Sequence, residues 1–464
     1  MPHADFYVSS RGTAPRLGFS DTLLAGLADD GGLYVPEAWP ALPAAARLPM
    51  PYAAAAEAVM SPFVGGDIPP DVLARLIREA YAGFDHADVV PLVEIAPDEW
   101  LLELFHGPTL AFKDLALQLL GRLFDHLLGE RRSRVTIVGA TSGDTGSAAI
   151  HACRGRDNID IFILHPAGRV SEVQRRQMTT VADANVHNIA IDGTFDDCQA
   201  LVKAMFADVR FRGDLNLSAV NSINWARVMA QIVYYVSAAA RLAGKGPVTF
   251  SVPTGNFGDV YAGYGAHRMG LDVARLVVAT NRNDILARAL GAGDYHVGTV
   301  SPTMSPSMDI QVSSNFERLL FELYDRDAGQ IRALMAGLAT ENGFTIAAPQ
   351  LARAQEIFSA ARVDEEQTLA TMAQVHAETG MLVDPHSAVG ICAGRAQARE
   401  PGTPLVMLAT AHPAKFPDAV AKATGRRPEP PAALAAALAG EERCADLPHD
   451  LTQVQTYIRA RAMR

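Results

Sequence analysis

Cysteine is scarce in this chain and carries no motif. Only four cysteines occur in 464 residues, and they are far apart: Cys153, Cys198, Cys392 and Cys444. No two of them form a CxxC pair, so the spacing favours neither a zinc site nor a disulfide framework. We expect reduced, mostly buried thiols and a functional site without a metal.

Positive charge and long apolar runs are also lacking. Lysine and arginine number 40 against 51 acidic residues, which leaves a net charge of -11. Broad binding to nucleic acid or to an anionic membrane needs clustered positive charge, so both are disfavoured. No apolar run approaches the ~18 residues of a membrane span, and residues 1–10 lack the basic and then apolar pattern of a secretory signal. We therefore expect a protein of the cytoplasm, with neither nucleic acid nor membrane as a partner.

Short apolar runs alternate with helical patterns along most of the chain. Such runs, without in/out alternation, occur at 133–140, 158–166, 185–192, 247–253, 273–281 and 404–411. Strands of this kind, separated by helices, predict an α/β fold with parallel sheets covered on both faces. Residues 1–96, rich in Ala and Pro, have few polar residues that could converge, and we interpret them as an accessory domain. In parallel sheets ligands bind beyond the carboxyl ends of the strands, so the loops there are the candidate site.

One lysine stands at an unusual place. In "FHGPTLAFKDLALQLLG", Lys113 lies among apolar residues where a helix begins. An ammonium in the first turn of a helix faces the positive end of the macrodipole. A ligand or a partner group is expected to hold it there.

Two Gly-containing loops follow predicted strands. "GATSGDTGS", residues 139–147, fits an oxyanion site, although a capped turn without a ligand explains the same residues, and Asp144 would repel a dianionic phosphate. "PTGNFGD", residues 253–259, could present consecutive amides to an anion, provided that Asp259 turns outward. Neither loop contains GxGxxG and no Gly-Lys-Ser/Thr follows, so nucleotide binding is disfavoured.

A third segment, "NSINWAR", precedes another helix. Asn221, Ser222 and Asn224 are common N-cap types, which is one explanation for them. The other is a second anion site, in which Arg227 offers a bidentate fork to phosphate. Together with the buried lysine and the absence of a metal motif, these loops suggest imine chemistry on pyridoxal phosphate, because a desolvated lysine forms an imine and the pyridine ring stabilises carbanions.

The motifs resemble those of one family. "FHGPTLAFKD", "TSGDTG", "NSINWAR", "PTGNFGD" and "TAHPAKF" occur in the order typical of threonine synthase, and "GLADDGGLYVP" and "DPHSAVG" resemble its longer bacterial and fungal branch. The resemblance covers about residues 5–425. It implies a fold-type II pyridoxal-phosphate enzyme, similar to the tryptophan synthase β chain, with a catalytic region at 97–425, a smaller subdomain at about 115–235 inserted in the larger one, and a C-terminal helical extension at 426–464.

The resemblance also implies roles for individual residues. Lys113 would carry the cofactor as an imine and transfer protons. Cofactor-binding residues would be Asp144, near the ring hydroxyl, the phosphate loop Gly255, Asn256, Phe257 and Gly258 with Asp259 at its edge, and Thr410, near the pyridine nitrogen. Substrate-binding residues would be Thr141, Ser142, Gly143 and Thr145 for the carboxylate, and Asn221, Ser222 and Arg227 for the phosphate.

The implied reaction is that of a carbon–oxygen lyase acting on phosphate. O-phospho-L-homoserine and water would give L-threonine and phosphate by γ-elimination and β-addition of water, the last step of threonine biosynthesis. A monomer or a dimer is implied. His106, inside the first motif, is a further catalytic candidate, although a hydrogen-bonded structural histidine fits it as well.

Two other functions fit parts of the sequence. A pyridoxal-phosphate-dependent phospho-lyase would eliminate phosphate from a phospho-amino acid and release a keto acid. A metabolite-binding α/β protein without catalysis would share the fold but would not form an imine with the cofactor.

Overall fold

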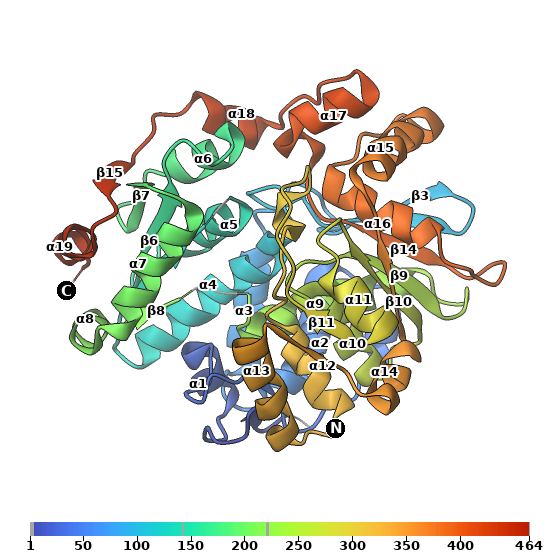
Figure 1. Cartoon of the computed structure of the whole chain (residues 1–464), viewed down its shortest axis with the longest axis horizontal. Helices are drawn as coiled ribbons and strands as arrows, with labels where there is room; N and C mark the ends of the chain where they lie inside the picture. The colour runs from blue at the N-terminus through green and yellow to red at the C-terminus, as the bar shows by residue number, and fades with distance from the viewer. Residues whose placement is uncertain (1–3, 142, 220–221, 464) are drawn as a thin grey trace. The chain divides into compact units, whose positions relative to one another are not determined.

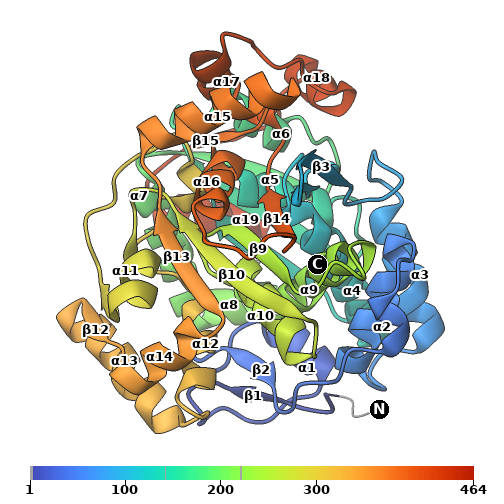
Figure 2. The ribbon, with the colours of Figure 1, turned by 90° about the vertical axis from the view of Figure 1, so that its right-hand side faces the viewer.

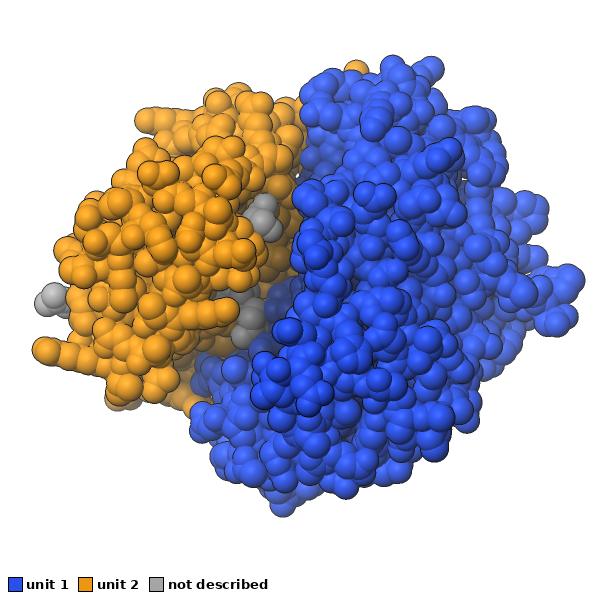
Figure 3. All heavy atoms as spheres, viewed as in Figure 1, with its two compact units in different colours: residues 1–78, 84–106, 222–428 blue, residues 79–83, 107–221, 429–464 orange. Residues whose placement is uncertain are grey.

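The computed structural model (Figure 1, Figure 2) describes residues 4–141, 143–219 and 222–463. The chain divides into two compact units, which Figure 3 colours separately. The larger unit comprises residues 1–78, 84–106 and 222–428, and the smaller unit comprises residues 79–83, 107–221 and 429–464. No helix of these described residues is both long and apolar enough to cross a membrane.

The larger unit is built on a six-stranded sheet with the order β13-β10-β9-β14-β4-β3. All neighbours in it are parallel except β3 and β4, which are antiparallel. Its strands are β3 (Leu92–Ala96), β4 (Glu99–Glu103), β9 (Val248–Pro253), β10 (Val273–Thr280), β13 (Phe358–Arg362) and β14 (Leu405–Ala409). Two short antiparallel pairs accompany it: β1 (Tyr7–Ser9) with β2 (Tyr34–Pro36), and β11 (Asp294–His296) with β12 (Gly343–Thr345).

Twelve α-helices accompany these strands in the described part of the chain. They are α1 (Phe19–Ala25), α2 (Tyr52–Val64), α3 (Pro70–Tyr81), α9 (Trp225–Arg241), α10 (Gly258–Arg268), α11 (Ile285–Ala292), α12 (Phe316–Leu323), α13 (Ala328–Glu341), α14 (Ala348–Gln355), α15 (Glu365–Thr379), α16 (Pro385–Arg395) and α17 (Pro417–Thr424). Three 3-10 turns are η1 (Ala44–Arg47), η2 (Pro306–Met308) and η3 (Pro413–Lys415).

Helix α9 is the central helix of the larger unit. Every residue of it except Ala239 and Arg241 is buried, as expected for a helix that is apolar on nearly all sides. Helix α10 packs against it closely because Gly263 has no side chain: a Cβ there would lie 2.8 Å from the ring of Tyr235. This packing fixes the position of the loop that precedes α10.

The smaller unit has a five-stranded, wholly parallel sheet with the order β15-β7-β6-β5-β8. Its strands are β5 (Val135–Ala140), β6 (Ile159–Pro166), β7 (Val186–Asp192), β8 (Leu217–Ser218) and β15 (Ala445–Pro448). Its helices are α4 (Lys113–Glu130), α5 (Asp144–Cys153), α6 (Glu172–Thr179), α7 (Phe195–Ala207), α8 (Val209–Leu215), α18 (Ala432–Ala439) and α19 (Leu451–Arg461). The prediction of parallel sheets covered by helices is confirmed.

At both ends of the chain the observed elements differ from the predicted ones. Residues 426–464, predicted as a helical extension, contain α18 and α19 but also β15, which adds an edge strand beside β7. Figure 1 shows α18 next to α6 and α19 next to α7. At the other end, β3 closes the predicted accessory domain and pairs with β4 in the larger sheet.

Candidate active site

The loop before α4 buries Lys113. Lys113 is the first residue of the helix and is 8% exposed. Leu110 has a left-handed backbone (φ 59°), and the fully buried Asp114 accepts hydrogen bonds from both the backbone N–H and the hydroxyl of Thr109, each at 2.7 Å. The motif around Lys113 therefore folds into a turn that is closed by its own side chains and that directs the lysine into the interior.

A carboxylate faces that lysine. The Oδ2 of Asp144, in the first turn of α5, lies 3.7 Å from Nζ of Lys113, and its Oδ1 accepts a hydrogen bond from Nε2 of Gln174 at 2.9 Å. Asp144 is 6% exposed, so the pair lies in a poorly solvated region where charges interact more strongly than in water. Gln174 was not predicted, because it lies 30 residues away on α6. That helix also carries Gln177, which donates to the carbonyl of Thr109 at 3.1 Å.

The loop predicted to bind the substrate carboxylate is partly occupied by its own groups. The hydroxyl of Thr141 accepts hydrogen bonds from the backbone N–H of Gly143 (3.1 Å) and Gly146 (3.0 Å), and it donates to the carbonyl of Gly143. Thr141 therefore shapes the loop. We expected its hydroxyl to face a ligand, but it is bonded within the loop. Thr145 is half-buried in the first turn of α5, and Ser142 lies outside the described residues.

The second predicted loop forms a cradle of backbone amides between β9 and α10. Phe257 is the N-cap of α10 in a left-handed conformation (φ 63°), and no described side chain caps the helix. The ring of Phe257 is buried against Phe316 and Phe358, with centroids 5.1 and 5.8 Å away. A Cβ on Gly255 would lie 2.8 Å from the carbonyl oxygen of Ser307. Uncapped amides at the start of a helix bind anions, so residues 255–258 fit the predicted phosphate site.

Asp259 does not take the orientation that we expected. Its carboxylate turns inward and accepts hydrogen bonds from the hydroxyls of Tyr234 (2.5 Å) and Tyr235 (2.8 Å) on α9. Burial raises the pKa of Asp259 to about 6, although the two tyrosine hydrogen bonds act in the opposite direction. The carboxylate is therefore removed from the cradle, which no longer has a negative charge at its edge. The prediction that Asp259 itself contacts the cofactor phosphate is not supported by this geometry.

A segment that the sequence analysis missed braces the cradle. Residues 313–315, Ser-Ser-Asn, form what we call the strap. Ser313 donates to the carbonyl of Gly255 (2.5 Å), and the amide N–H and the side chain of Asn315 donate to the carbonyl of Asn256 (3.0 and 3.1 Å). The hydroxyl of Ser314 donates to Oδ1 of Asn256 (3.2 Å). Serines in a loop have no periodic signal, so only the tertiary structure reveals the strap.

The strap also reaches the third predicted segment. The hydroxyls of Ser222 and Ser314 are 3.1 Å apart, and the side chain of Asn315 donates to the carbonyl of Ser222 at 3.1 Å. Asn224 is indeed the N-cap of α9, with its Oδ1 accepting from the N–H of Ala226 at 3.0 Å. Asn221 lies outside the described residues. The same three residues therefore hold both predicted anion loops of the larger unit.

Arg227 is a buried cation in the first turn of α9. It is 4% exposed, and burial lowers its pKa to about 10. A cation at this end of a helix is unfavourable with respect to the macrodipole. The arrangement resembles that of Lys113 in the smaller unit, and it is compatible with an anionic ligand at the start of α9.

Two further residues lie in the loop after β14. Thr410 is 5% exposed and directly follows the strand, at the carboxyl edge of the larger sheet. Lys415, which the sequence analysis did not single out, is 2% exposed at the end of η3. A buried lysine at the ligand-binding edge of a parallel sheet is a candidate for contact with an anion.

His106 is held between two carboxylates. Its Nδ1 is 2.7 Å from Oδ1 of Asp85, and its Nε2 is 2.8 Å from Oε2 of Glu103. Burial lowers the pKa of His106, but the hydrogen bonds to Glu103 and Asp85 outweigh it, so the pKa lies above its ordinary value. With both ring nitrogens engaged, His106 fits a structural role better than the catalytic role that we considered.

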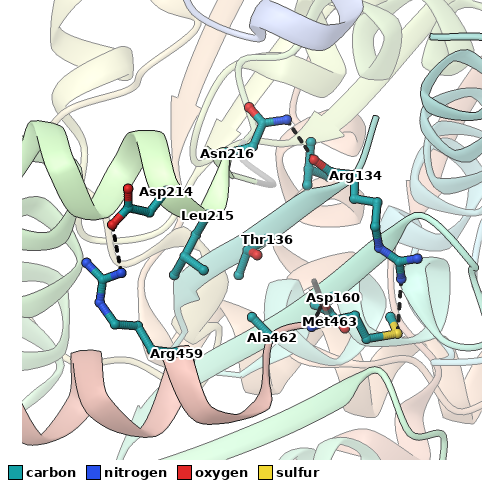
Figure 4. A pocket seen from close by; sticks show the side chains of 10 residues that line it. Arg134, Thr136, Asp160, Asp214, Leu215, Asn216, Arg459, Ala462 and Met463 are labelled. Atoms are coloured by element: carbon teal, nitrogen blue, oxygen red, sulfur yellow. Dashed lines mark hydrogen bonds and ion pairs between the residues drawn. The ribbon is translucent and has the colours of Figure 1, made fainter. Parts of the chain in front are cut away.

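The smaller unit has a hollow of about 530 Å³, and Figure 4 shows the side chains that line it, none of which belongs to the predicted site. Thr136 and Asp160 line it at the amino ends of β5 and β6, and Asp214 and Arg459 form an ion pair across part of it at 2.9 Å. The backbone N–H of Met463 donates to Asp160 at 2.8 Å. Because ligands of parallel sheets bind at the carboxyl ends of strands, we do not assign this hollow to the predicted chemistry. Within the described ranges, no group of three or more His, Cys, Asp or Glu residues could hold a metal ion.

Comparison with known proteins identifies the family. The family model described as "Pyridoxal-phosphate dependent enzyme" matches residues 91–348, and those described as "Threonine synthase N terminus" and "Threonine synthase, C-terminal" match residues 6–81 and 387–458. The three matches follow one another along nearly the whole chain. They support both the predicted cofactor class and the predicted branch of that class.

Full-length relatives agree with these models. The chain is 54% identical to the threonine synthase of Pseudomonas aeruginosa over 97% of each chain. The crystal structure of a PLP-bound threonine synthase from Brucella melitensis superposes with a TM-score of 0.97 at 54% identity, covering 99% of this chain and 100% of that one. The yeast threonine synthase gives a TM-score of 0.95 at 38% identity, with 99% of each chain covered. The chain therefore belongs to the threonine synthase family of fold-type II pyridoxal-phosphate-dependent enzymes.

Proposed function

We propose that this chain converts O-phospho-L-homoserine and water to L-threonine and phosphate, with pyridoxal phosphate as its cofactor. The observation that carries the proposal is the buried Lys113, 3.7 Å from the Asp144 carboxylate, in a chain that matches a threonine synthase over 97% of its length. An α/β protein that only binds a metabolite would not need a buried lysine at this position.

The residues of the chain fit the chemistry of the cofactor. The uncapped amides of residues 255–258 suit a dianionic phosphate, and the inward turn of Asp259 removes the charge that would repel it. The amine of Lys113 suits an aldehyde, and the hydroxyl of Thr410 suits a ring nitrogen. These assignments are proposals for this chain, as is the assignment of Asp144 to the ring hydroxyl.

Ser222 and Arg227 are proposed to bind the phosphate of the substrate. Arg227 is buried, so an anion beside it would be poorly screened by solvent, and a guanidinium can donate two parallel hydrogen bonds to phosphate. Ser222 is fixed by the strap. Asn221 is part of the same proposal from the sequence. Substrates without a terminal phosphate would not use this site. The site would therefore make the enzyme specific for a phosphorylated substrate.

The proposed mechanism assigns proton transfer to Lys113. When bound, pyridoxal phosphate supplies an electron-withdrawing ring that stabilises negative charge at Cα and Cβ of the substrate. With its amine free, Lys113 would accept the Cα proton of the substrate. Asp144, oriented by Gln174, lies near enough to stabilise the protonated amine. Thr145 is proposed to orient the substrate carboxylate through its backbone amide. The Gly143 amide and the Thr141 hydroxyl are bonded to each other and would shape the loop that presents it.

We infer that the protein acts on a small molecule in the cytoplasm, as a monomer or a dimer. Its net negative charge disfavours nucleic acid and anionic membranes as partners. We retain the division into residues 1–96, 97–425 and 426–464 as a functional proposal, in which the first segment is an accessory domain.

An absorbance spectrum before and after borohydride, followed by an assay with O-phospho-L-homoserine, tests the function. We expect an imine band that borohydride removes, and threonine and phosphate in equal amounts. Phosphate together with a keto acid would indicate a phospho-lyase instead. If no band forms even after addition of the cofactor, the catalytic proposal is wrong.

A further inference from the structure

Asp384 makes more hydrogen bonds than a helix cap requires. It is the N-cap of α16 and is fully buried. Its Oδ2 accepts from the backbone N–H of His386 (3.0 Å) and from the ring Nδ1 of His386 (2.7 Å). Its Oδ1 accepts from the backbone N–H of Ser387 (3.0 Å) and from the Ser387 hydroxyl. One backbone contact would cap the helix, so the two side-chain contacts need another explanation.

The first of these contacts leads to the cradle. Nε2 of His386 accepts a hydrogen bond from the backbone N–H of Ser307 at 3.2 Å, so the ring proton is on Nδ1, facing Asp384. The carbonyl of Ser307 is the atom that a Cβ on Gly255 would meet at 2.8 Å. His386 is 4% exposed and packs on the ring of Phe416, with centroids 4.8 Å apart. It therefore transmits the position of Asp384 to the backbone that lies against the cradle.

The second contact leads to the end of β14. The Ser387 hydroxyl has one proton, which it donates to Asp384, so toward other groups it is an acceptor. It accepts the backbone N–H of Thr410 at 3.0 Å. An acceptor that is itself bonded to a buried carboxylate is polarised and holds its donor more firmly. The carboxylate thus fixes the backbone that carries the Thr410 hydroxyl.

We propose that Asp384 is a positioning residue for both ends of the bound cofactor. Through His386 and Ser307 it holds the phosphate cradle, and through Ser387 and Thr410 it holds the hydroxyl that meets the ring nitrogen. The inference rests on the proposed function, because it takes the cradle and Thr410 to be the cofactor contacts. It assigns a role to the "DPHSAVG" motif beyond starting a helix.

Variants of the holoenzyme that each remove one of the two side-chain contacts of Asp384 (the single-arm variants) test the two connections separately. Ser387→Ala should move the absorbance maximum of the bound cofactor and lower kcat roughly ten-fold, while cofactor affinity changes little. His386→Leu should weaken cofactor binding roughly ten-fold, while the absorbance maximum stays in place. Asp384→Asn should produce both effects. A matched control is Asp364→Asn, at the N-cap of the neighbouring helix α15, where the carboxylate is bonded to the backbone N–H of Gln367. The control should leave both readouts unchanged.

The outcomes distinguish this inference from the proposed function. A wild-type holoenzyme without an imine band or without threonine formation would refute the function, whatever the variants do. If the wild type is active and Asp384→Asn behaves like Asp364→Asn, the inference is wrong. It is also wrong if Ser387→Ala and His386→Leu affect both readouts equally, because that result indicates a general loss of packing. Should Asp384→Asn fail to fold, the two single-arm variants still decide between these results.

Discussion

The loops at the strand ends of the two units present different kinds of chemical group. In the smaller unit the important groups are side chains: the Lys113 ammonium, the Asp144 carboxylate and the Gln174 amide converge around one point. In the larger unit the cradle presents backbone, and its side chains turn away, with the Phe257 ring in the core and the Asp259 carboxylate bonded to tyrosines. Proton transfer needs a titratable side chain, whereas phosphate binding needs several aligned N–H groups.

This difference determines how substitutions impair each region. A side-chain site depends on one atom in one place, so removing that atom removes the chemistry. A backbone site depends on the shape of a loop, so it is damaged gradually by anything that moves the loop. Substitutions in the two regions should therefore differ in how much activity they remove.

Removing the Lys113 amine should abolish turnover. Lys113→Ala loses the proton-transferring group, and we expect kcat to fall by at least ~10³-fold, with loss of the imine band. The measurement is threonine formation together with the absorbance spectrum. Lys203→Ala, at an exposed lysine on α7, is the control and should behave like the wild type. A persistent imine band in Lys113→Ala would contradict the assignment.

Removing the Arg227 guanidinium should weaken substrate binding. Hydrogen bonds to charged groups contribute ~1.5–3 kcal/mol, so Arg227→Ala should raise KM for O-phospho-L-homoserine by roughly 10- to 100-fold. The cofactor should remain bound, as measured by its absorbance after dialysis. Loss of the cofactor with an unchanged KM would mean that our two anion sites are reversed.

Adding a methyl group to the cradle should have an intermediate effect. In Gly255→Ala the new Cβ would lie 2.8 Å from the Ser307 carbonyl, so the loop must shift. Overpacking of this kind costs ~1–3 kcal/mol, and we expect the dissociation constant of the cofactor to rise roughly ten-fold. The control is Gly291→Ala in α11, where no atom lies within 4 Å of the new Cβ. Equal affinity in the two variants would argue against residues 255–258 as the phosphate site.

The smallest effect on catalysis is expected at Asp259, where the predicted change concerns stability. The pKa of Asp259 is raised from 3.8 to about 6 by burial, so folding favours its protonated form. This contribution is present in full below the unfolded pKa of about 4, and it is lost as the pH rises through 6. Asp259→Asn cannot titrate. Relative to that variant, the wild type should lose up to ~3 kcal/mol of unfolding free energy between pH 4 and pH 7. Unfolding midpoints of both proteins at the two pH values measure it, and a constant difference would contradict the inward, poorly solvated carboxylate.

Much of the fold follows from local sequence patterns. Apolar runs such as 158–166 have no in/out alternation because β6 is buried on both faces, so the parallel sheet is readable from composition. Edge strand β15 was not predicted, because its four residues form no apolar run. Its partner β7 is also distant in the sequence, so no local pattern indicates the pairing. Lys113, the Gly-containing loops and the N-cap Asn224 were found because each is local in the chain.

Local patterns along the chain specify which groups this protein has and at which strand ends they lie: a lysine among apolar residues, Gly-rich turns before helices, and a cation beside a capped helix start. The directions of those side chains depend on the folded arrangement. The hydroxyl of Thr141 turns into its own loop, Asp259 turns toward α9, and Gln174, the strap and Asp384 supply partners from distant segments. The physical reason is that a buried polar group must find a hydrogen-bond partner, and that partner is chosen by packing rather than by proximity along the chain.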